Sequence, residues 1–539
     1  MGVAKEDDMI RRNIGSDKVT EKRNESKRIF RPPSNTTFSS GRSSSFRTTP
    51  RLLIALWVVL ILAVVYAVLP SSNGSTLRKP VTDDERCQAL TLKDQSELAN
   101  LEEIDLKGCN LSHLPTEIKY CTNLKKMDIS SNPLITTLPT ELGACTKLEI
   151  LFSSQNPGMT ALPKILGTMN SITRLGWRSG SLTAIDSESL PPNLVHLILT
   201  DNQILQLNDP EIFDRMTKVR KLMLSHNQIQ SLSPSGIEKL VNLELLRLAG
   251  NQLTSIPDEL WSLPKLTWLT ISGNPGLALP KLDQRVPTIS LENVQAVKGA
   301  DSYLGAGASG SVAARIWNGR SVAVKTIHGV TSDGRAEDEL QMYGAVGPEG
   351  MQHHVVGCLA VFRDDDKSGV IMERIPMGTG GHDLEDLALP PTIIEVTTDR
   401  WMPNDQREYD FDFIMNALGN AVDALSFLHY TAHVAHGDFY AHNIKVDNLS
   451  GNLFLLDLGA SWATGPYAKQ AEKLEVRAFG ILVQELLERQ KEGKQRDTKQ
   501  ALSSRLASLA MSCLDADTDK RPAFSEIARE LDEIKAGSL

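Results

Sequence analysis

The segment "LELLRLAGNQL" at residues 243–253 carries apolar residues at its first, fourth, sixth and eleventh positions and an asparagine at its ninth. The same pattern recurs in "LEEIDLKGCNL" (101–111), "LKKMDISSNPL" (124–134), "LVHLILTDNQI" (194–204) and "VRKLMLSHNQI" (219–229). Units of this kind open at Leu101, Leu124, Leu148, Ile172, Leu194, Val219, Leu243 and Leu266. Such a period predicts one short strand, a turn and a return segment per unit, with each apolar face buried by stacking on the next unit.

These spacings and residue types resemble the leucine-rich repeat family over residues 98–280, which implies an α/β solenoid. The asparagines of the ninth position are Asn132, Asn156, Asn202, Asn227, Asn251 and Asn274. A side-chain amide at this position can satisfy backbone groups that a tight turn leaves unpaired. Cys109 and Gly180 take its place in two units, where we expect a weaker ladder.

The outward-facing strand residues predict a concave recognition surface. Its predicted members are Lys125, Lys126, Arg174, Arg178, His196, Arg220, Arg247 and Trp268. We expect this surface to bind a protein substrate or regulator.

A second feature precedes the repeats. Residues 1–50 are polar and basic with no apolar periodicity, which predicts a disordered tail. The following run "LLIALWVVLILAVVYAVL", residues 52–69, has no charge, glycine or proline, which predicts one transmembrane helix. Because both the repeats and the rest of the chain follow this run, we expect them on the same side of a single-pass membrane protein.

Composition narrows the function classes. The net charge of −9 argues against non-specific nucleic-acid binding, so no nucleic-acid partner is expected. Six cysteines in 539 residues predict no disulfide framework, and paired cysteine caps on the repeats are not evident. A reduced compartment is the simpler interpretation.

After residue 297 the repeat pattern stops and a glycine-rich segment follows, "YLGAGASGSVAARIWNGRSVAVKTI". Gly305, Gly307 and Gly310 form G-x-G-x-x-G with Val312 two residues later. Glycines let backbone amides approach phosphate oxygens. The flanking residues favour a strand pair rather than a helix, and the second strand carries Lys325.

The segment "HVAHGDFYAHNIKV", residues 433–446, adds Asp438 and Asn443 on one loop, and "LFLLDLGAS" adds Asp457. In this order the motifs resemble a eukaryotic-type protein kinase domain, here over 297–539, so that the whole chain resembles a divergent leucine-rich repeat protein kinase. The resemblance implies an α+β two-lobed fold that uses ATP and Mg²⁺.

Site roles follow from that resemblance. Gly305, Gly307, Gly310 and Val312 would cover ATP, and Lys325 would pair with its α- and β-phosphates. A helical glutamate, Glu339 rather than Glu337, would hold Lys325. The segment Met372 to Ile375, including Glu373, would contact the adenine. Asp438 would act as the catalytic base, while Asn443 and Asp457 would be the metal ligands.

Several positions depart from the kinase pattern. Gly437 stands where many kinases have Arg, Tyr440 where many Ser/Thr kinases have Lys, and the segment from Asp457 to "LEVRAFG" is short. No A-P-E is present, so Arg521 is expected to lack its usual Glu partner, with Glu472 or Glu475 as a candidate substitute.

The predicted function is therefore a membrane-anchored protein kinase that phosphorylates protein hydroxyls, Ser or Thr, on partners recruited by the repeats. One alternative is a pseudokinase scaffold that binds nucleotide and acts as an interaction module. Another is a small-molecule phosphotransferase, since "HGD" followed by Asn also resembles aminoglycoside and choline phosphotransferases.

The membrane orientation is contested by two patterns. Twelve Lys/Arg before residue 52 place the tail in the cytosol by the positive-inside rule. Cytosolic ATP and the lack of cysteine caps favour the opposite orientation, and we expect the kinase to face the cytosol.

Overall fold

The computed structural model describes residues 86–537 except 278, 298–301, 308, 328, 330, 332, 365–366, 402–407 and 492–496. The predicted tail and the predicted transmembrane run at 52–69 lie outside these residues. Among the helices that are described, none combines the length and apolar character that a membrane span requires.

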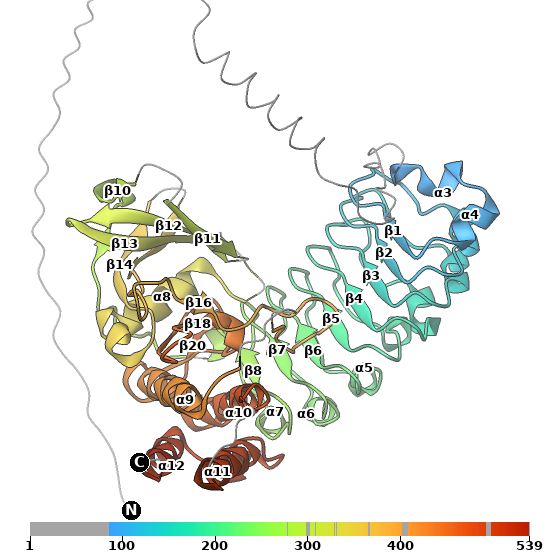
Figure 1. Cartoon of the computed structure of the whole chain (residues 1–539). Helices are drawn as coiled ribbons and strands as arrows, with labels where there is room; N and C mark the ends of the chain where they lie inside the picture. The colour runs from blue at the N-terminus through green and yellow to red at the C-terminus, as the bar shows by residue number, and fades with distance from the viewer. Residues whose placement is uncertain are drawn as a thin grey trace, which may run out of the picture. The chain divides into compact units, whose positions relative to one another are not determined.

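The repeats form one parallel sheet of eight short strands, paired in chain order from β1 to β8. The strands are β1 (Glu103–Asp105), β2 (Lys126–Asp128), β3 (Ile150–Phe152), β4 (Arg174–Gly176), β5 (His196–Ile198), β6 (Lys221–Met223), β7 (Leu245–Arg247) and β8 (Trp268–Thr270). They line one face of the solenoid, and α5 (Pro210–Asp214), α6 (Pro234–Ile237) and α7 (Asp258–Trp261) lie on the opposite face (Figure 1). Each strand contributes one residue to each register line across the sheet.

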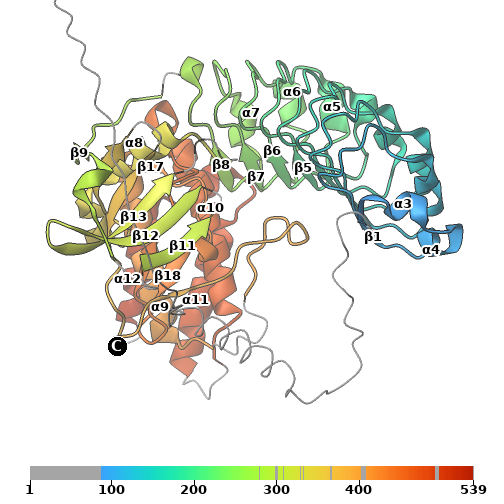
Figure 2. The same cartoon turned by 90° about the horizontal axis from the view of Figure 1, so that it is seen from above.

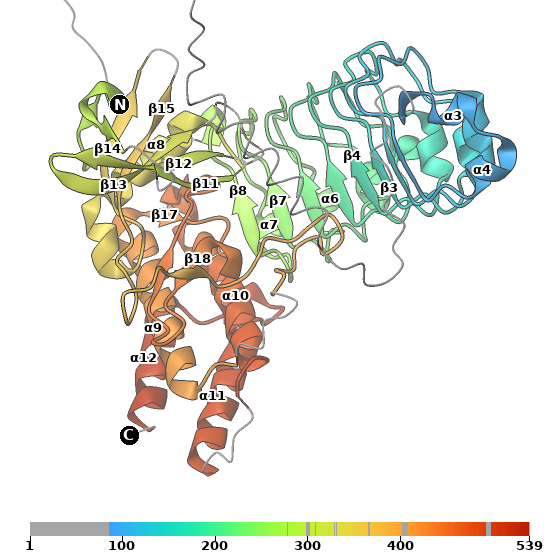
Figure 3. The same cartoon turned by 45° about the horizontal axis from the view of Figure 1, so that its top comes forward.

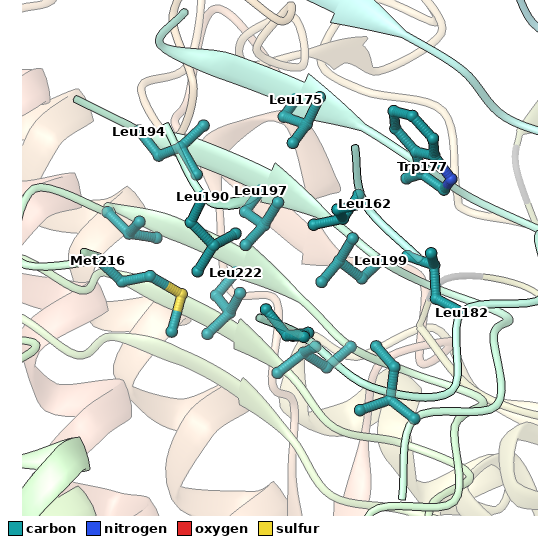
Figure 4. Packing of buried hydrophobic residues seen from close by; sticks show 14 of the residues in the cluster. Leu162, Leu175, Trp177, Leu182, Leu190, Leu194, Leu197, Leu199, Met216 and Leu222 are labelled. Carbon is teal, nitrogen blue, oxygen red and sulfur yellow. The ribbon is translucent and has the colours of Figure 1, made fainter. Parts of the chain in front are cut away.

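The apolar positions of the repeat build the solenoid core. Leu175, Leu197 and Leu222 point inward from successive strands, and Leu199 and Leu182 pack behind them (Figure 4). Trp177 belongs to the same core and is fully buried. The period therefore specifies the core because each unit covers the apolar face of its neighbour.

The asparagine ladder is confirmed. Asn251 donates from Nδ2 to the carbonyls of Leu224 and Leu248, both at 3.0 Å, and accepts from the amide of Ile229 at 3.1 Å. Asn132 makes the equivalent contacts at the other end of the solenoid. Each buried amide thus satisfies backbone groups of two neighbouring units.

The cysteine prediction was wrong at the first repeat. Cys87 and Cys109 form a disulfide, with their Cα atoms 5.3 Å apart. Cys109 occupies the ladder position that asparagine fills elsewhere, so a covalent bond to the preceding segment takes the place of the amide contacts there. The other four cysteines are free and buried.

The C-terminal part begins with a sheet in which β11 (Tyr303–Gly307), β12 (Gly310–Trp317) and β13 (Arg320–Ile327) are antiparallel neighbours. β15 (Ser368–Glu373) and β14 (Cys358–Arg363) continue it. The linker adds β9 (Thr288–Ile289) and β10 (Gln295–Ala296) to its two edges. This unit therefore starts earlier than the predicted boundary at 297.

Helix α8 (Ala336–Val346) packs against β14 and β15 of this sheet. The long helices α9 (Phe411–Ser426), α10 (Ala468–Leu487), α11 (Asp497–Cys513) and α12 (Phe524–Ala536) form a separate helical group (Figure 3). Two small sheets accompany them: β16 (Glu385–Asp386), β18 (Ile444–Val446) and β19 (Leu453–Leu455), and the pair β17 (Val434–Ala435) and β20 (Trp462–Ala463).

The solenoid and the C-terminal part share one continuous compact unit, residues 80–539. Trp462, Ala435, Ala471 and Leu474 belong to the same apolar cluster as the solenoid leucines. Helix α10 contacts β8, the last strand of the solenoid, and Figure 2 shows the two next to each other. The end of the solenoid is therefore packed onto the C-terminal part of the chain.

Candidate functional site

A cavity of about 430 Å³ opens between the first sheet of the C-terminal part and the β18–β19 hairpin. The glycine-rich turn contributes Gly307 and Gly310, and Val312 follows on β12. Gly305, which was predicted to cover ATP, is not among its lining residues. The predicted adenine segment does line it, through Met372, Glu373, Arg374 and Ile375. The cavity is thus bounded by the residues of several sequence motifs.

Lys325 and Asp457 line the inner wall of this cavity, and Glu339 pairs with Lys325 from outside the lining. Lys325, from β13, places Nζ 2.6 Å from Glu339 Oε1 and 2.7 Å from Asp457 Oδ1. Glu339, on the buried side of α8, is 3% exposed, whereas Glu337 on the same helix faces solvent. One ammonium group therefore holds two carboxylates that come from distant parts of the chain.

Burial and charge act in opposite directions on this cluster. Burial alone would lower the pKa of Lys325, but the surrounding carboxylates and Tyr343 outweigh it and the pKa lies above its usual value. Burial raises the pKa of Glu339 to about 7. The nearby negative charge of Asp457 adds to this rise, and the charge of Lys325, which the two carboxylates share, only partly offsets it. The site carries an excess of negative charge that a bound cation would offset.

Asn443 and Asp457 line the same cavity, and their side-chain oxygens are of the kind that Mg²⁺ prefers as ligands. Asn443 uses its Nδ2 to donate to the carbonyl of Asp438 at 2.8 Å, which leaves its side-chain oxygen without a protein donor among the described residues. The side chain of Asp457 is 44% exposed and its backbone φ is +53°, a conformation that aspartate tolerates better than most residues. Mg²⁺ is commonly held by one or two protein oxygens together with substrate phosphates.

The loop that carries Asp438 is fixed from three directions. His436 lies against the carbonyl of Leu456 at 2.8 Å, and the amide of Asp438 donates to His436 Nδ1 at 3.2 Å. Glu475 accepts from the amide of Gly437 at 2.7 Å. The Asn443 amide also reaches Asp438 Oδ2 at 3.0 Å. Asp438 and Asn443 are therefore held side by side, as their spacing predicts.

The solenoid contributes a residue that was predicted for a different role. Arg247, the last residue of β7, donates to Asp438 Oδ1, to the carbonyl of Gly437 at 2.8 Å, and to Asp333 Oδ1 at 3.0 Å. Its side chain is only 3% exposed. Burial alone would raise the pKa of Asp438, but the Arg247 charge outweighs burial and holds that pKa below its usual value.

Aromatic residues extend this contact. The ring of Trp268, on β8, stacks on Tyr440 with the ring centroids 3.9 Å apart, and Trp268 Nε1 donates to the carbonyl of Phe439 at 2.9 Å. Trp462 Nε1 donates to the solenoid carbonyl of Leu269, also at 2.9 Å. The solenoid thus covers the outer side of residues 437–440.

The predicted open concave surface needs correction in its second half. Arg174 donates to the carbonyls of Ile393 and Ile394, and Arg220 donates to Thr397, so a loop of the C-terminal part lies on β4–β6. His196, Arg247 and Trp268 are buried. A protein partner cannot contact these three residues in this conformation.

Among the described residues, neither Glu472 nor Glu475 takes the place of the usual Glu partner of Arg521. Arg521 donates to the backbone carbonyls of Asp515, Lys473 and Pro264. Glu472 instead accepts from the amide of Phe524, and Glu475 pairs with His429.

The comparisons with known proteins concern the repeats. Leucine-rich repeat models match residues 100–121 and 123–145, and residues 192–253 and 217–275. The chain contains leucine-rich repeats. All of these matches fall within the β1–β8 solenoid and the turns that flank it.

Curated relatives match over short stretches. Tsukushi-A of Xenopus laevis is 32% identical over 133 residues, which cover 22% of this chain and 38% of that protein. Podocan of Mus musculus is 33% identical over 108 residues, covering 19% of this chain and 17% of that protein. The chain therefore spans well under half the length of these relatives. A solved leucine-rich repeat protein of Leptospira interrogans is 27% identical, covers 33% of this chain and 51% of its own, and superposes with a TM-score of 0.29.

Proposed function

We propose that residues from about 286 to 537 form a two-lobed kinase-like domain that binds Mg-ATP and transfers the γ-phosphoryl group to a protein hydroxyl, Ser or Thr. The observation that carries this proposal is the meeting of Lys325, Asp457 and Asn443 in the lining of one cavity, with Glu339 pairing with Lys325 from outside the lining. These residues come from four separate segments of the sequence. Their convergence is the arrangement that phosphoryl transfer requires.

Each residue has a role in this proposal. Lys325 pairs with the phosphates, and Glu339 keeps its ammonium group inside the cavity. Asn443 and Asp457 hold Mg²⁺, which neutralises charge on the phosphates. Asp438 orients the acceptor hydroxyl and accepts its proton as the new P–O bond forms and the bond to ADP breaks.

The leucine-rich repeats bind a protein, and we propose that this protein is the acceptor or its regulator. The N-terminal strands are the available surface, because Glu103 and Asp105 on β1 are exposed. A partner held there lies on the same compact unit as the cavity, which raises its effective concentration near the site.

A labelling experiment tests the proposed transfer. The full chain is incubated with γ-labelled ATP, Mg²⁺ and a mixture of generic proteins. Transfer by the wild type should fall about a hundredfold or more in Asp438→Asn. The matched pair Glu339→Gln and Glu337→Gln should separate, with loss in the first and little change in the second, because only Glu339 contacts Lys325. Wild-type transfer equal to that of Asp438→Asn would overturn the proposal.

A second candidate function is a nucleotide-binding scaffold without transfer. It is favoured by the cover over the catalytic loop, where Trp268 and Tyr440 are both buried against each other. A folded protein acceptor has no open platform beside Tyr440 in this conformation. Mg-ATP binding without labelling of any protein in the same assay would support the scaffold.

We also propose that Leu52–Leu69 anchors the chain in a membrane as a single-pass protein with the kinase-like domain on the cytosolic face, where ATP is available. The lack of paired cysteines no longer supports the cytosolic orientation. Cys87 and Cys109 form a disulfide, and disulfides are typical of oxidising compartments. Digestion of the kinase-like domain in sealed vesicles without detergent would support the cytosolic face. Its protection would place the domain in the lumen.

A further inference from the structure

Arg247 differs from every residue that occupies the same place in the repeat. The register line through the third strand position contains Asp105, Asp128, Phe152, Gly176, Ile198, Met223 and Thr270. Two of these residues are acidic and the rest are uncharged, so the repeat itself does not require an arginine. The reason for Arg247 therefore lies in what covers β7.

The contacts of Arg247 join two segments of the C-terminal part. Nη1 and Nη2 bind the carbonyl of Gly437 and the carboxylate of Asp438, while Nε binds Asp333. Two carboxylates compensate the burial of one guanidinium group, which makes this contact unlike an exposed surface ion pair. The planar guanidinium can satisfy all three acceptors at once, whereas an ammonium group is a point charge.

Asp333 connects this contact to the nucleotide cavity. It lies three residues before α8, the helix whose Glu339 holds Lys325. The solenoid also contacts this segment through His226, whose Nε2 lies 2.7 Å from the carbonyl of Thr331, and through Thr270, which donates to the carbonyl of Asp333 at 3.3 Å. The solenoid thus fixes the start of α8 and the loop of Asp438 together.

Gly437 completes the fit. A Cβ atom on this residue would lie 2.9 Å from the carbonyl of Leu269 in the solenoid and 2.4 Å from that of Ala460. Its φ of +73° also disfavours residues with a side chain. The position before Asp438 has no room for a side chain because the carbonyls of Ala460 and of Leu269 in the solenoid occupy that space, and an arginine from β7 lies beside Asp438.

We propose that Arg247 is a positioning residue for phosphoryl transfer: the solenoid supplies the guanidinium that fixes Asp438 and couples its loop to the segment before α8. This inference rests on the proposed function and adds a residue from outside the kinase-like domain. Arg247 acts on Asp438 and not on the nucleotide, because it does not line the cavity. The second oxygen of Asp438 contacts only the amide of Asn443 among the described residues, and the side chain is 22% exposed, so an acceptor can still approach it.

The test separates kcat from the KM for ATP in the full chain. Arg247→Ala and Arg247→Lys are compared with wild type and with Lys218→Ala, an exposed solenoid cation whose amine bonds Asn193. Both Arg247 variants should lower kcat about tenfold or more while the KM for ATP stays within about twofold. Arg247→Lys should not restore kcat, because one ammonium group cannot reach all three acceptors of the arginine. Lys218→Ala should match wild type.

The outcomes are distinguishable. Arg247→Lys with a kcat near that of wild type would overturn the positioning role while the proposed function stands. An increase in kcat for Arg247→Ala would also overturn it, because the arginine would then block Asp438. A wild-type chain that transfers no phosphoryl group would overturn the proposed function, and the positioning role with it. If Arg247→Ala does not fold, Arg247→Lys, which keeps the charge, decides the question.

Discussion

The two ends of the solenoid are built from the same repeat, yet their strand faces differ. In β1 only the central Ile104 is buried, with Glu103 and Asp105 exposed on either side. In β7 and β8 all three residues are buried. From Asn132 in the second unit to Asn251 in the seventh, the asparagine ladder makes the same hydrogen bonds. The repeat therefore determines the ladder and the burial of the central strand residue. The burial of the two flanking strand residues depends on which part of the chain covers that face of the sheet.

The largest difference in the free energy of unfolding should appear between two residues at the same register position of the sheet. Trp268 and Lys126 both open their strands, but Trp268 is 3% exposed and stacks on Tyr440, while the Lys126 side chain is 42% exposed. We expect Trp268→Ala to lower the free energy of unfolding of the full chain by about 3–5 kcal/mol. Lys126→Ala should change it by less than about 0.5 kcal/mol in the same denaturant titration. Equal effects would mean that the C-terminal part does not cover β8.

The ladder should respond equally at both ends. Asn132→Ala and Asn251→Ala each remove one donor from neighbouring carbonyls that keep a second donor, and leave one amide, that of Leu111 or Ile229, without its acceptor. We expect each to lower the free energy of unfolding by about 1–3 kcal/mol. A loss of stability in Asn251→Ala alone would show that the ladder depends on the C-terminal residues that cover the strands.

A pH dependence of the free energy of unfolding should come from a buried histidine on the strand face that the C-terminal part covers. His196 on β5 is 4% exposed, neither ring nitrogen has a hydrogen-bond partner among the described residues, and burial lowers its pKa to about 3. Below pH 6.5 the unfolded chain takes up a proton that the folded chain refuses, so stability falls as the pH is lowered. The loss should reach about 2 kcal/mol at pH 5.

Denaturant titrations at pH 7.5 and 5 check this prediction. His196→Leu should remove that part of the pH dependence. His113→Leu, which changes an exposed histidine of the first repeat, should keep it. An unchanged pH dependence in His196→Leu would place the titrating group elsewhere.

The smallest effect should come from the exposed end. Lys125 and Glu102 form an ion pair at 2.9 Å, but their side chains are 50% and 62% exposed. Because solvent and salt screen such pairs, Glu102→Gln should leave the unfolding curve unchanged within experimental error. A clear loss of stability would mean that the N-terminal strands carry a cover of their own.

The local features of this protein could be predicted from its sequence. Neighbouring repeats are about two dozen residues apart, so periodicity alone identifies which leucines are buried and which asparagines form the ladder. The order of the glycine turn, Lys325, Asp438, Asn443 and Asp457 identified the residues that surround the cavity and its loop. Glu339 was separable from Glu337 because only one of them lies on the buried side of α8.

The long-range features could not be predicted. Arg247 and Asp438 are 191 positions apart, and their contact depends on how the solenoid packs against the C-terminal part. Arg247 was therefore predicted as an exposed ligand-binding residue. Gly437 was the available signal, since a missing side chain before Asp438 indicates close approach of another segment. The disulfide was missed because Cys87 lies outside the repeat pattern that contains Cys109.

Titration of the full chain with ATP in the presence and absence of Mg²⁺ tests the central claim most directly. Wild type should bind one ATP in a Mg²⁺-dependent manner. Lys325→Met and Asp457→Asn should lose that binding, whereas Asp438→Asn should keep it, because Asp438 does not line the cavity. A wild type that binds no ATP, or a Lys325→Met variant that binds as tightly as wild type, would contradict the account.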